Sequence, residues 1–155
     1  MKRVKVSENF YLDEFMHPTI YRSLGGGSLK LIDERIITII QELRVDIKAP
    51  IYINNWFNGN PVYSGSLKIP NKYINSGLRL AKGIGATYSQ HRYGRAVDIK
   101  VKGFTPKEVQ EFILKNEDKY RKLGLSRLED ADYTKTWNHL DCAFTKSDNI
   151  QIFKP

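Results

Sequence analysis

The chain has 155 residues, of which 41% are hydrophobic and 12% aromatic, and its formal net charge at pH 7 is +8. This length fits one compact domain, and the hydrophobic content excludes a disordered chain. No apolar run approaches the roughly 20 residues that cross a bilayer, so we expect a single folded domain over residues 1–155 without a membrane span. The positive charge can attract nucleic acid, anionic lipid or anionic envelope polymers, and charge alone does not choose among them.

The beginning of the sequence does not resemble a secretion signal. The basic residues 1–6 are followed by the polar residues 7–9, where a signal peptide would have its apolar core. The single cysteine, Cys142, excludes an internal disulfide framework and is typical of a protein made in a reducing cytoplasm. We therefore expect synthesis in the cytoplasm without a signal peptide.

The first helix that the pattern predicts precedes Pro50. Leucine and isoleucine recur at helical spacing over residues 31–43, Ser28 can cap this segment, and Pro50 stops it. The glycines at 25–27 are too few for a domain linker and indicate a loop. We expect this helix to cover one side of a sheet.

Two strands are predicted in the middle of the chain. Residues 51–56 are rich in β-branched and aromatic side chains, and the glycine- and asparagine-rich stretch after them indicates an extended loop. In residues 96–101 apolar side chains alternate with Asp98 and Lys100, which predicts a strand with one apolar face. Asp98 should then point away from the core.

The last clear helix begins at Thr105 and ends before Gly124. Thr105 supplies an N-cap, Pro106 fits the first turn, and Glu108 completes a capping box. Gly124 follows the final basic turn, as expected of a glycine that ends a helix.

A further strand is predicted over residues 137–144. Strand alternation puts Trp137, His139 and Asp141 on one face and sends Cys142 to the other, where we expect a buried thiol. If this strand lies beside residues 96–101, His139 and Asp98 line one cleft.

The histidines point to a metal site. The chain has three, and two of them, His91 and His139, lie beside strands that present a polar side chain to one face. Catalytic zinc commonly takes three protein ligands from histidine and carboxylate and keeps a fourth position open, and His91, Asp98 and His139 supply such a set. His17, which precedes Pro18, has no motif around it and is expected to be a cap or a surface residue.

Two segments carry motifs. Residues 89–98 follow the pattern SxHxxGxAxD, and residues 137–141 follow WxHxD. Together they resemble the zinc D-alanyl-D-alanine carboxypeptidase and peptidoglycan endopeptidase family. Residues 7–15 resemble the opening of its short phage-borne members, and residues 53–56 and 76–79 resemble other family segments. The resemblance implies a hedgehog-type zinc peptidase fold of the α+β class, in which a small, mainly antiparallel sheet carries a zinc site in a cleft and helices pack on its other face.

The resemblance also assigns roles to residues. It implies that His91, Asp98 and His139 bind one Zn²⁺ ion per chain. Arg79 matches the arginine that holds the substrate carbonyl or the oxyanion formed from it, and Ser89 matches a serine beside the site.

The general base does not follow from simple matching. Several family members have a glutamate three residues before the second histidine, where this chain has Thr136. Glu129 is the preferred candidate, because it resembles a glutamate upstream of WxHxD in the phage-borne members. Asp132 and Asp141 are alternatives, although Asp141 fits better as the carboxylate that orients His139.

The implied function is hydrolysis of a peptide bond in peptidoglycan stem peptides by a monomeric endolysin or virion-associated lysin. Such an enzyme reaches the cell wall through a holin, host lysis or the virion, and its charge favours docking on anionic envelope polymers. Carboxypeptidase and endopeptidase activity both stay open, and the loop over residues 57–73 is expected to decide between them.

Two other classes of function are alternatives to the enzyme. The first is a non-catalytic phage structural or cell-wall-binding protein that retains the metallopeptidase fold, which Thr136 keeps open. The second is a nucleic-acid-binding protein, but the sequence has no helix-turn-helix pattern, zinc-finger cysteine pairs or aromatic RNA-binding signature. We therefore expect no specific nucleic-acid partner.

Overall fold

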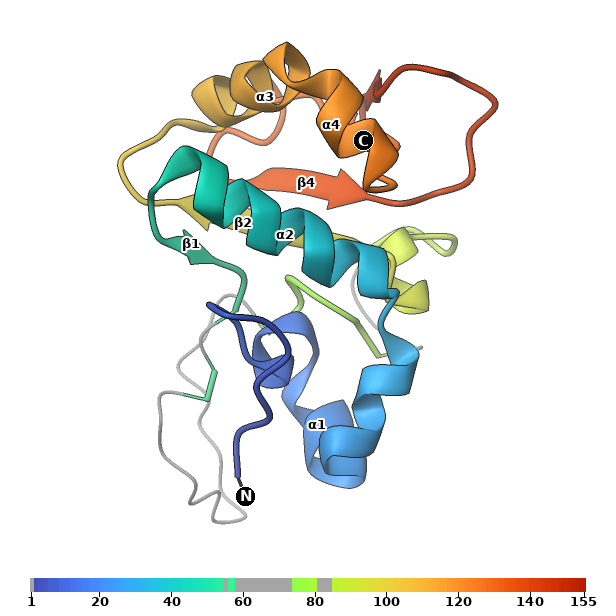
Figure 1. Cartoon of the computed structure of the whole chain (residues 1–155). Helices are drawn as coiled ribbons and strands as arrows, with labels where there is room; N and C mark the ends of the chain where they lie inside the picture. Colours follow the sequence, from blue (N-terminus) through green and yellow to red (C-terminus); the bar gives the residue numbers. More distant parts are fainter. Residues whose placement is uncertain (1, 55, 58–73, 81–84) are drawn as a thin grey trace.

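The structure, a computed structural model, describes residues 2–54, 56–57, 74–80 and 85–155 (Figure 1). Its helices are α1 (Pro18–Leu24), α2 (Glu34–Ile47), α3 (Pro106–Lys115) and α4 (Glu117–Lys122), and its short 3-10 helices are η1 (Leu12–Phe15), η2 (Gly25–Leu31) and η3 (Gln90–Tyr93). The strands are β1 (Ile51–Tyr52), β2 (Ala96–Val101), β3 (Arg127–Glu129), β4 (Asn138–Asp141) and β5 (Gln151–Phe153). Among the described residues, no helix is long and apolar enough to cross a membrane.

The five strands form one sheet in the order β1-β2-β4-β3-β5. All neighbours pair antiparallel except β3 and β5, which run parallel. The predicted α+β class with a mainly antiparallel sheet is therefore confirmed. The sequence did not predict β5.

The helix predicted before Pro50 is present as α2, but its predicted cap is wrong. Ser28 lies in η2, where its hydroxyl donates to the carbonyl of Gly25. Asp33 caps α2 instead, and its carboxylate accepts the backbone N–H of Arg35. The reason is local, because η2 forms a separate turn and Asp33 stands directly before the first helical residue.

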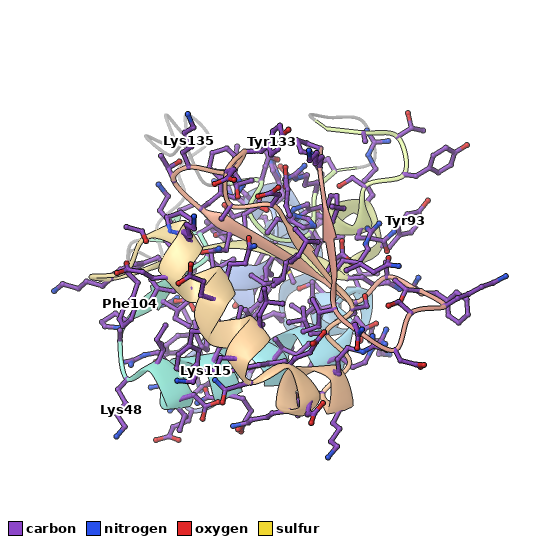
Figure 2. The ribbon with its side chains drawn as sticks, turned by 90° about the horizontal axis from the view of Figure 1, so that it is seen from above. Lys48, Tyr93, Phe104, Lys115, Tyr133 and Lys135 are labelled. Atoms are coloured by element: carbon purple, nitrogen blue, oxygen red, sulfur yellow. The ribbon has the colours of Figure 1, made fainter. Side chains whose placement is uncertain are left out.

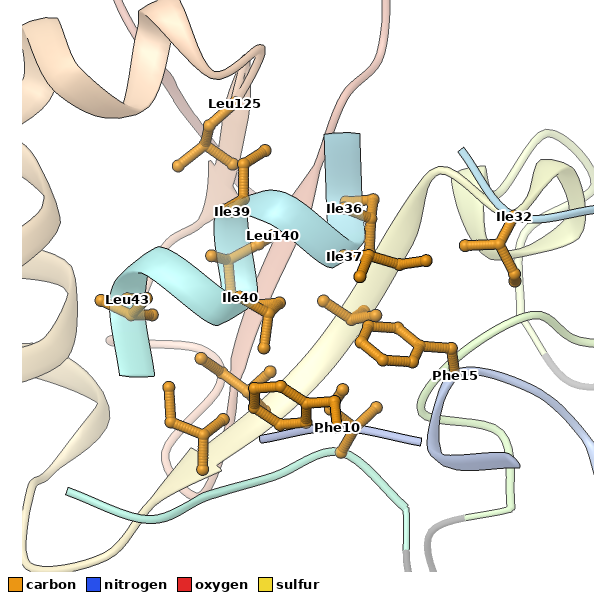
Figure 3. Close-up of a cluster of buried hydrophobic side chains, with 14 of the residues drawn as sticks. Phe10, Phe15, Ile32, Ile36, Ile37, Ile39, Ile40, Leu43, Leu125 and Leu140 are labelled. Carbon is orange, nitrogen blue, oxygen red and sulfur yellow. The ribbon is translucent and has the colours of Figure 1, made fainter. Parts of the chain in front are cut away.

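One face of the sheet carries the hydrophobic core. Figure 3 shows the isoleucines of α2 gathered with Leu43 against Leu140 of β4 and the rings of Phe10 and Phe15. Val97, Leu140 and Leu128 pair with one another across β2, β4 and β3, and all are buried. Because alternate residues of a strand point to opposite faces, their neighbours Asp98 and His139 face away from this core.

The strand predicted over residues 51–56 is shorter than expected. Only Ile51–Tyr52 pairs, as β1, and the chain then turns toward the N-terminal segment. The side-chain amide of Asn54 and the indole N–H of Trp56 both donate to the carbonyl of Met16. These hydrogen bonds replace the strand ladder, and Trp56 belongs to the core.

The helix predicted from Thr105 to Gly124 is divided in two. Its capping box forms as predicted, with the Thr105 hydroxyl and the Glu108 carboxylate each accepting the other's backbone N–H. At Asn116, however, the side-chain amide donates to the carbonyl of Phe112 at 2.8 Å, and α3 ends there before α4 begins. Asparagine favours such local hydrogen bonds over the helical ladder.

The strand predicted over residues 96–101 is β2, and the one predicted over 137–144 is shortened to β4. The two strands are neighbours, and Asp98 lies directly opposite His139. This pairing places both side chains on the same face of the sheet.

Basic side chains are spread over the surface. Lys48, Lys115 and Lys135 are all exposed, and Figure 2 shows them at separate places on the molecule. They come from the end of α2, the end of α3 and the segment before β4, so these three lysines do not form one basic arm.

Candidate metal centre

Three side chains that can bind a metal ion converge on the face of the sheet opposite the core. Asp98 Oδ1 lies 3.1 Å from His91 Nε2 and 2.9 Å from His139 Nδ1, and the two nitrogens are 3.1 Å apart. His91 and His139 are buried and Asp98 is partly buried. This group can hold a metal ion, because each side chain offers one ligand atom to a common point.

Local structure explains why the three meet. Asp98 and His139 are paired across β2 and β4, while His91 comes from η3. Gly94, which ends η3 with a φ of +65°, turns the chain back toward β2. A Cβ at Gly94 would lie 2.0 Å from the carbonyl oxygen of Leu31, so this turn requires glycine both for its φ and for space.

Each histidine has an outer partner that decides which ring nitrogen faces the centre. The Nδ1 of His91 lies 2.9 Å from the carbonyl oxygen of Gly77, and the Nε2 of His139 lies 3.1 Å from the carboxylate of Asp141. Both oxygens accept hydrogen bonds, so these nitrogens carry the protons. His91 Nε2 and His139 Nδ1 are left to bind a metal, and two imidazoles with a carboxylate suit zinc.

Burial and mutual contacts shift the pKa values of the three side chains. Burial favours the neutral form of His139, but its hydrogen bonds to Asp141 and Asp98 outweigh burial and raise its pKa to about 9. Burial lowers the pKa of His91. For Asp98, attraction to His91 and hydrogen bonds from both histidines outweigh burial and lower the pKa of the carboxyl.

His91, Asp98 and His139, called the metal group below, lie in a cleft of about 780 Å³. Its walls include Arg79, Ser89, Glu129, Trp137 and Phe153, which come from widely separated parts of the chain. Ring contacts within the wall are close, since the Phe153 ring meets the His139 ring edge-on with centroids 5.6 Å apart. Residues 58–73, most of the loop expected to shape the substrate cleft, lie outside the described residues.

Arg79 lies beside the metal group and contacts one of its members. Its Nη2 donates to the second carboxylate oxygen of Asp98 at 2.9 Å, and its Nε donates to the carbonyl of Asn75 at 2.7 Å. A Cβ at Gly85 would lie 2.7 Å from Arg79 Nη1, so glycine leaves room for the guanidinium. Its contact with a substrate carbonyl stays a prediction.

Glu129 belongs to the same row of side chains as Asp98 and His139. Arg127 pairs with Asp141 and Leu128 with Leu140, so the next position along the ladder sets Glu129 opposite His139. Asp98, His139 and Glu129 thus follow one another across β2, β4 and β3 on the cleft face. Burial raises the pKa of Glu129, which favours proton uptake there.

The alternative bases are less well placed. Asp132 is exposed and does not line the cleft. Thr136, at the position where several family members have a glutamate, is exposed and lies outside the cleft lining as well. Asp141 lines the cleft but already accepts hydrogen bonds from His139 and Arg127. Ser89 lines the cleft at the start of η3, and its carbonyl accepts the backbone N–H of Arg92.

Sequence reasoning missed several contributors to the site. Arg127 holds Asp141 and Phe153 packs on His139, but both contacts depend on how β3, β4 and β5 pair. The alternation of residues 150–153 was a weak signal for β5. Gly77 lies in a segment noted only for Arg79, and a Cβ there would lie 2.1 Å from the carbonyl oxygen of Phe15.

Two other expectations concern residues near or outside the site. His17 caps α1 by accepting the backbone N–H of Thr19, so the prediction of a cap is confirmed. Cys142 is buried as predicted, and burial raises the pKa of its thiol to about 12. A thiol with this pKa is not a nucleophile at neutral pH.

No family model, curated protein or solved structure matches the chain. The features of this chain that bear on its function are therefore its own residues. Those residues are the metal group, the carboxylate beside it and the motifs that contain them.

Proposed function

We propose that this protein is a zinc metallopeptidase that hydrolyses a peptide bond in the stem peptides of bacterial peptidoglycan. The observation that carries the proposal is the convergence of His91 Nε2, Asp98 Oδ1 and His139 Nδ1 in an accessible cleft. Catalytic zinc sites have this composition, with three protein ligands and room for a water molecule or substrate.

When bound, zinc would supply a Lewis acid that lowers the pKa of a bound water molecule toward 7 and polarises a carbonyl group. Glu129 accepts the proton of the attacking water, and the burial that raises its pKa suits this role. Arg79 holds Asp98 through one nitrogen and donates to the oxygen of the scissile carbonyl as negative charge develops there.

The substrate class is proposed from the motifs SxHxxGxAxD and WxHxD, which resemble those of peptidases that act on peptidoglycan. The net charge of +8 favours approach to an anionic envelope. In this proposal the protein acts as an endolysin or virion-associated lysin, and it reaches the wall after release through a holin, lysis or the virion.

The first test is the metal content of untagged protein, measured by elemental analysis beside a His139→Ala variant. We expect about one zinc per chain in the parent protein and little in the variant, because the variant lacks one of three ligands. If neither protein holds zinc even after zinc is supplied, the peptidase proposal is overturned.

The second test is digestion of purified peptidoglycan and of soluble stem peptides by the zinc-loaded protein. New amino groups within the wall identify an endopeptidase, and a released terminal residue identifies a carboxypeptidase. Zinc binding without cleavage of either material contradicts the enzyme and favours the cell-wall-binding or structural protein. Chelator treatment of the same sample is the control.

A further inference from the structure

Arg127 makes the closest contacts to the carboxylate that orients His139. Its Nε lies 2.9 Å from Asp141 Oδ1 and its Nη2 lies 2.7 Å from Asp141 Oδ2. The Asp141 side chain is fully buried, while that of Arg127 is 28% exposed. We propose that Arg127 is a positioning residue that sets the zinc affinity of the site by fixing Asp141 against His139. This inference rests on the proposed zinc site.

The contacts of Asp141 define the orientation of its carboxylate. Oδ1 accepts Arg127 Nε and the backbone N–H of Ala143, and Oδ2 accepts Arg127 Nη2 and the Nε2–H of His139. A two-point guanidinium contact fixes both the position and the plane of a carboxylate. With the plane fixed, Oδ2 stays directed at His139 Nε2, and the ring presents Nδ1 to the metal.

Arg127 is itself held in place from two sides. Its backbone pairs directly with Asp141 across β3 and β4, so both side chains lie on the cleft face. On the other side, its guanidinium carbon lies 4.7 Å from the centre of the Phe153 ring, which also packs on His139. The planar guanidinium can stack and bind the carboxylate at once, which a lysine ammonium cannot do.

A different outcome is expected if the ion pair between Arg127 and Asp141 only stabilises the fold. Its loss would lower the stability of the fold but leave the zinc affinity and the protonation of His139 unchanged. If Arg127 positions His139, the zinc affinity must fall even in variants that fold normally. Outer partners of this kind typically change metal affinity about 10–100-fold.

The experiment compares Arg127→Met and Arg127→Lys with Arg121→Met. Arg121 is a matched control because it also binds oxygens distant in sequence, the carbonyls of Ser147 and Asp148, but does not line the cleft. Zinc affinity is measured by competition with a chromophoric chelator. In the zinc-loaded proteins, nitrogen NMR of the imidazoles reports which ring nitrogen of His139 carries the proton, and thermal unfolding checks the fold.

We expect Arg127→Met to bind zinc about 10–100-fold more weakly and to lose the single Nε2–H form of His139. Arg127→Lys, which keeps the charge and loses the two-point contact, should fall between Arg127→Met and the parent protein. Arg121→Met should match the parent. If Arg127→Met does not fold, Arg127→Lys decides alone, and parental zinc affinity with an unchanged His139 spectrum in that variant overturns the inference.

The experiments distinguish a failure of the proposed peptidase function from a failure of the positioning role. A parent protein that binds zinc but cleaves no peptidoglycan contradicts the peptidase, while the difference between the Arg127 variants still tests the positioning role. Equal zinc affinity in the parent and in a folded Arg127→Met variant contradicts only the positioning role. A parent protein that binds no zinc overturns both.

Discussion

Among the described side-chain carboxylates that line the cleft, Glu129 is the one that neither belongs to the metal group nor orients a member of it. Asp98 offers its oxygen to the metal position, and Asp141 is held between His139 and Arg127. Glu129 lies next to His139 in the row that crosses the sheet, and burial raises its pKa. A carboxylate in this position can accept a proton without giving up a structural contact.

Glu129→Gln should lower the rate of peptide hydrolysis at least about 100-fold while leaving zinc bound, because glutamine has a similar shape and cannot take up the proton. Asp132→Asn, which changes an exposed carboxylate outside the cleft, is the control and should keep parental activity. Turnover and zinc content are measured on the same samples. Full activity in Glu129→Gln would move the base to another group.

A second carboxylate, Glu14, makes the stability of the fold depend on pH. Burial and the neighbouring charge of Asp13 outweigh the contacts to Arg3 and Tyr11 and raise the pKa of Glu14 from 4.5 to about 7. A carboxyl whose pKa is raised in the folded state contributes stability that is fully present below pH 4.5 and is lost as pH rises through 7.

Glu14→Gln should therefore be more stable than the parent at pH 8, by roughly 1–3 kcal/mol, and this advantage should disappear by pH 4.5. Glutamine can still accept the backbone N–H of Tyr11 in the capping box. Urea unfolding of the metal-free proteins at both pH values measures the difference. Glu111→Gln, at an exposed position of α3, is the control. If Glu14→Gln and the parent differ in stability by the same amount at both pH values, the pH effect is ruled out.

At the scale of elements, the metal group depends on one turn and on one strand pairing. The turn through η3 and Gly94 brings His91 to β2, and the pairing of β2 with β4 sets Asp98 against His139. The segment over residues 76–79 supports both. The carbonyl of Ser76 accepts the backbone N–H of Asp98, and the carbonyl of Gly77 accepts a hydrogen bond from the ring Nδ1 of His91. A change in backbone position at any of these places should move one of the three side chains that can hold a metal ion.

Gly94→Ala should be markedly less stable than Gly103→Ala. Both glycines have a positive φ, which costs a residue with a Cβ about 1–2 kcal/mol, but only at Gly94 would the Cβ also clash with the carbonyl of Leu31. We expect the clash to add about 1–3 kcal/mol and to weaken zinc binding through His91. Denaturant unfolding and zinc titration of both variants test this, and equal behaviour of the two would contradict it.

At the scale of the whole molecule, the sheet separates the core from the site. Apolar side chains of β2, β3 and β4 pack under α2 on one face (Figure 3). The metal group and its partners line the cleft on the other face. The two faces are linked because β2, β3 and β4 each contribute to both in alternation. An ion bound by residues of β2, β4 and η3 would therefore tie together parts of the fold that are distant in sequence.

Zinc should raise the melting temperature of the protein, because the ligands come together only in the folded chain. At a free concentration of 100 times the dissociation constant, binding adds about 2.7 kcal/mol, which corresponds to roughly 5–10 °C for a domain of this size. Thermal unfolding with zinc and with a chelator measures the shift. His139→Ala should show almost none, and an equal shift in that variant would mean that the stabilising ion binds elsewhere.

The sequence by itself determined the features that depend on neighbouring residues. The alternation in β2, the capping box at Thr105 and the Gly94 turn between His91 and Asp98 are local patterns, and the structure contains each of them. Local signals were misleading where a nearer side chain competed, as Asp33 did with Ser28 for the cap of α2.

Only the tertiary structure decided how distant segments meet. The register of β3 against β4 places Glu129 opposite His139 and Arg127 opposite Asp141, and the parallel pairing of β5 brings Phe153 onto the His139 ring. No local pattern encodes these contacts, because strand pairing is chosen by how the whole sheet buries its apolar face. The sequence therefore identified the side chains that can bind a metal, and the packing of the sheet determined which neighbours orient them.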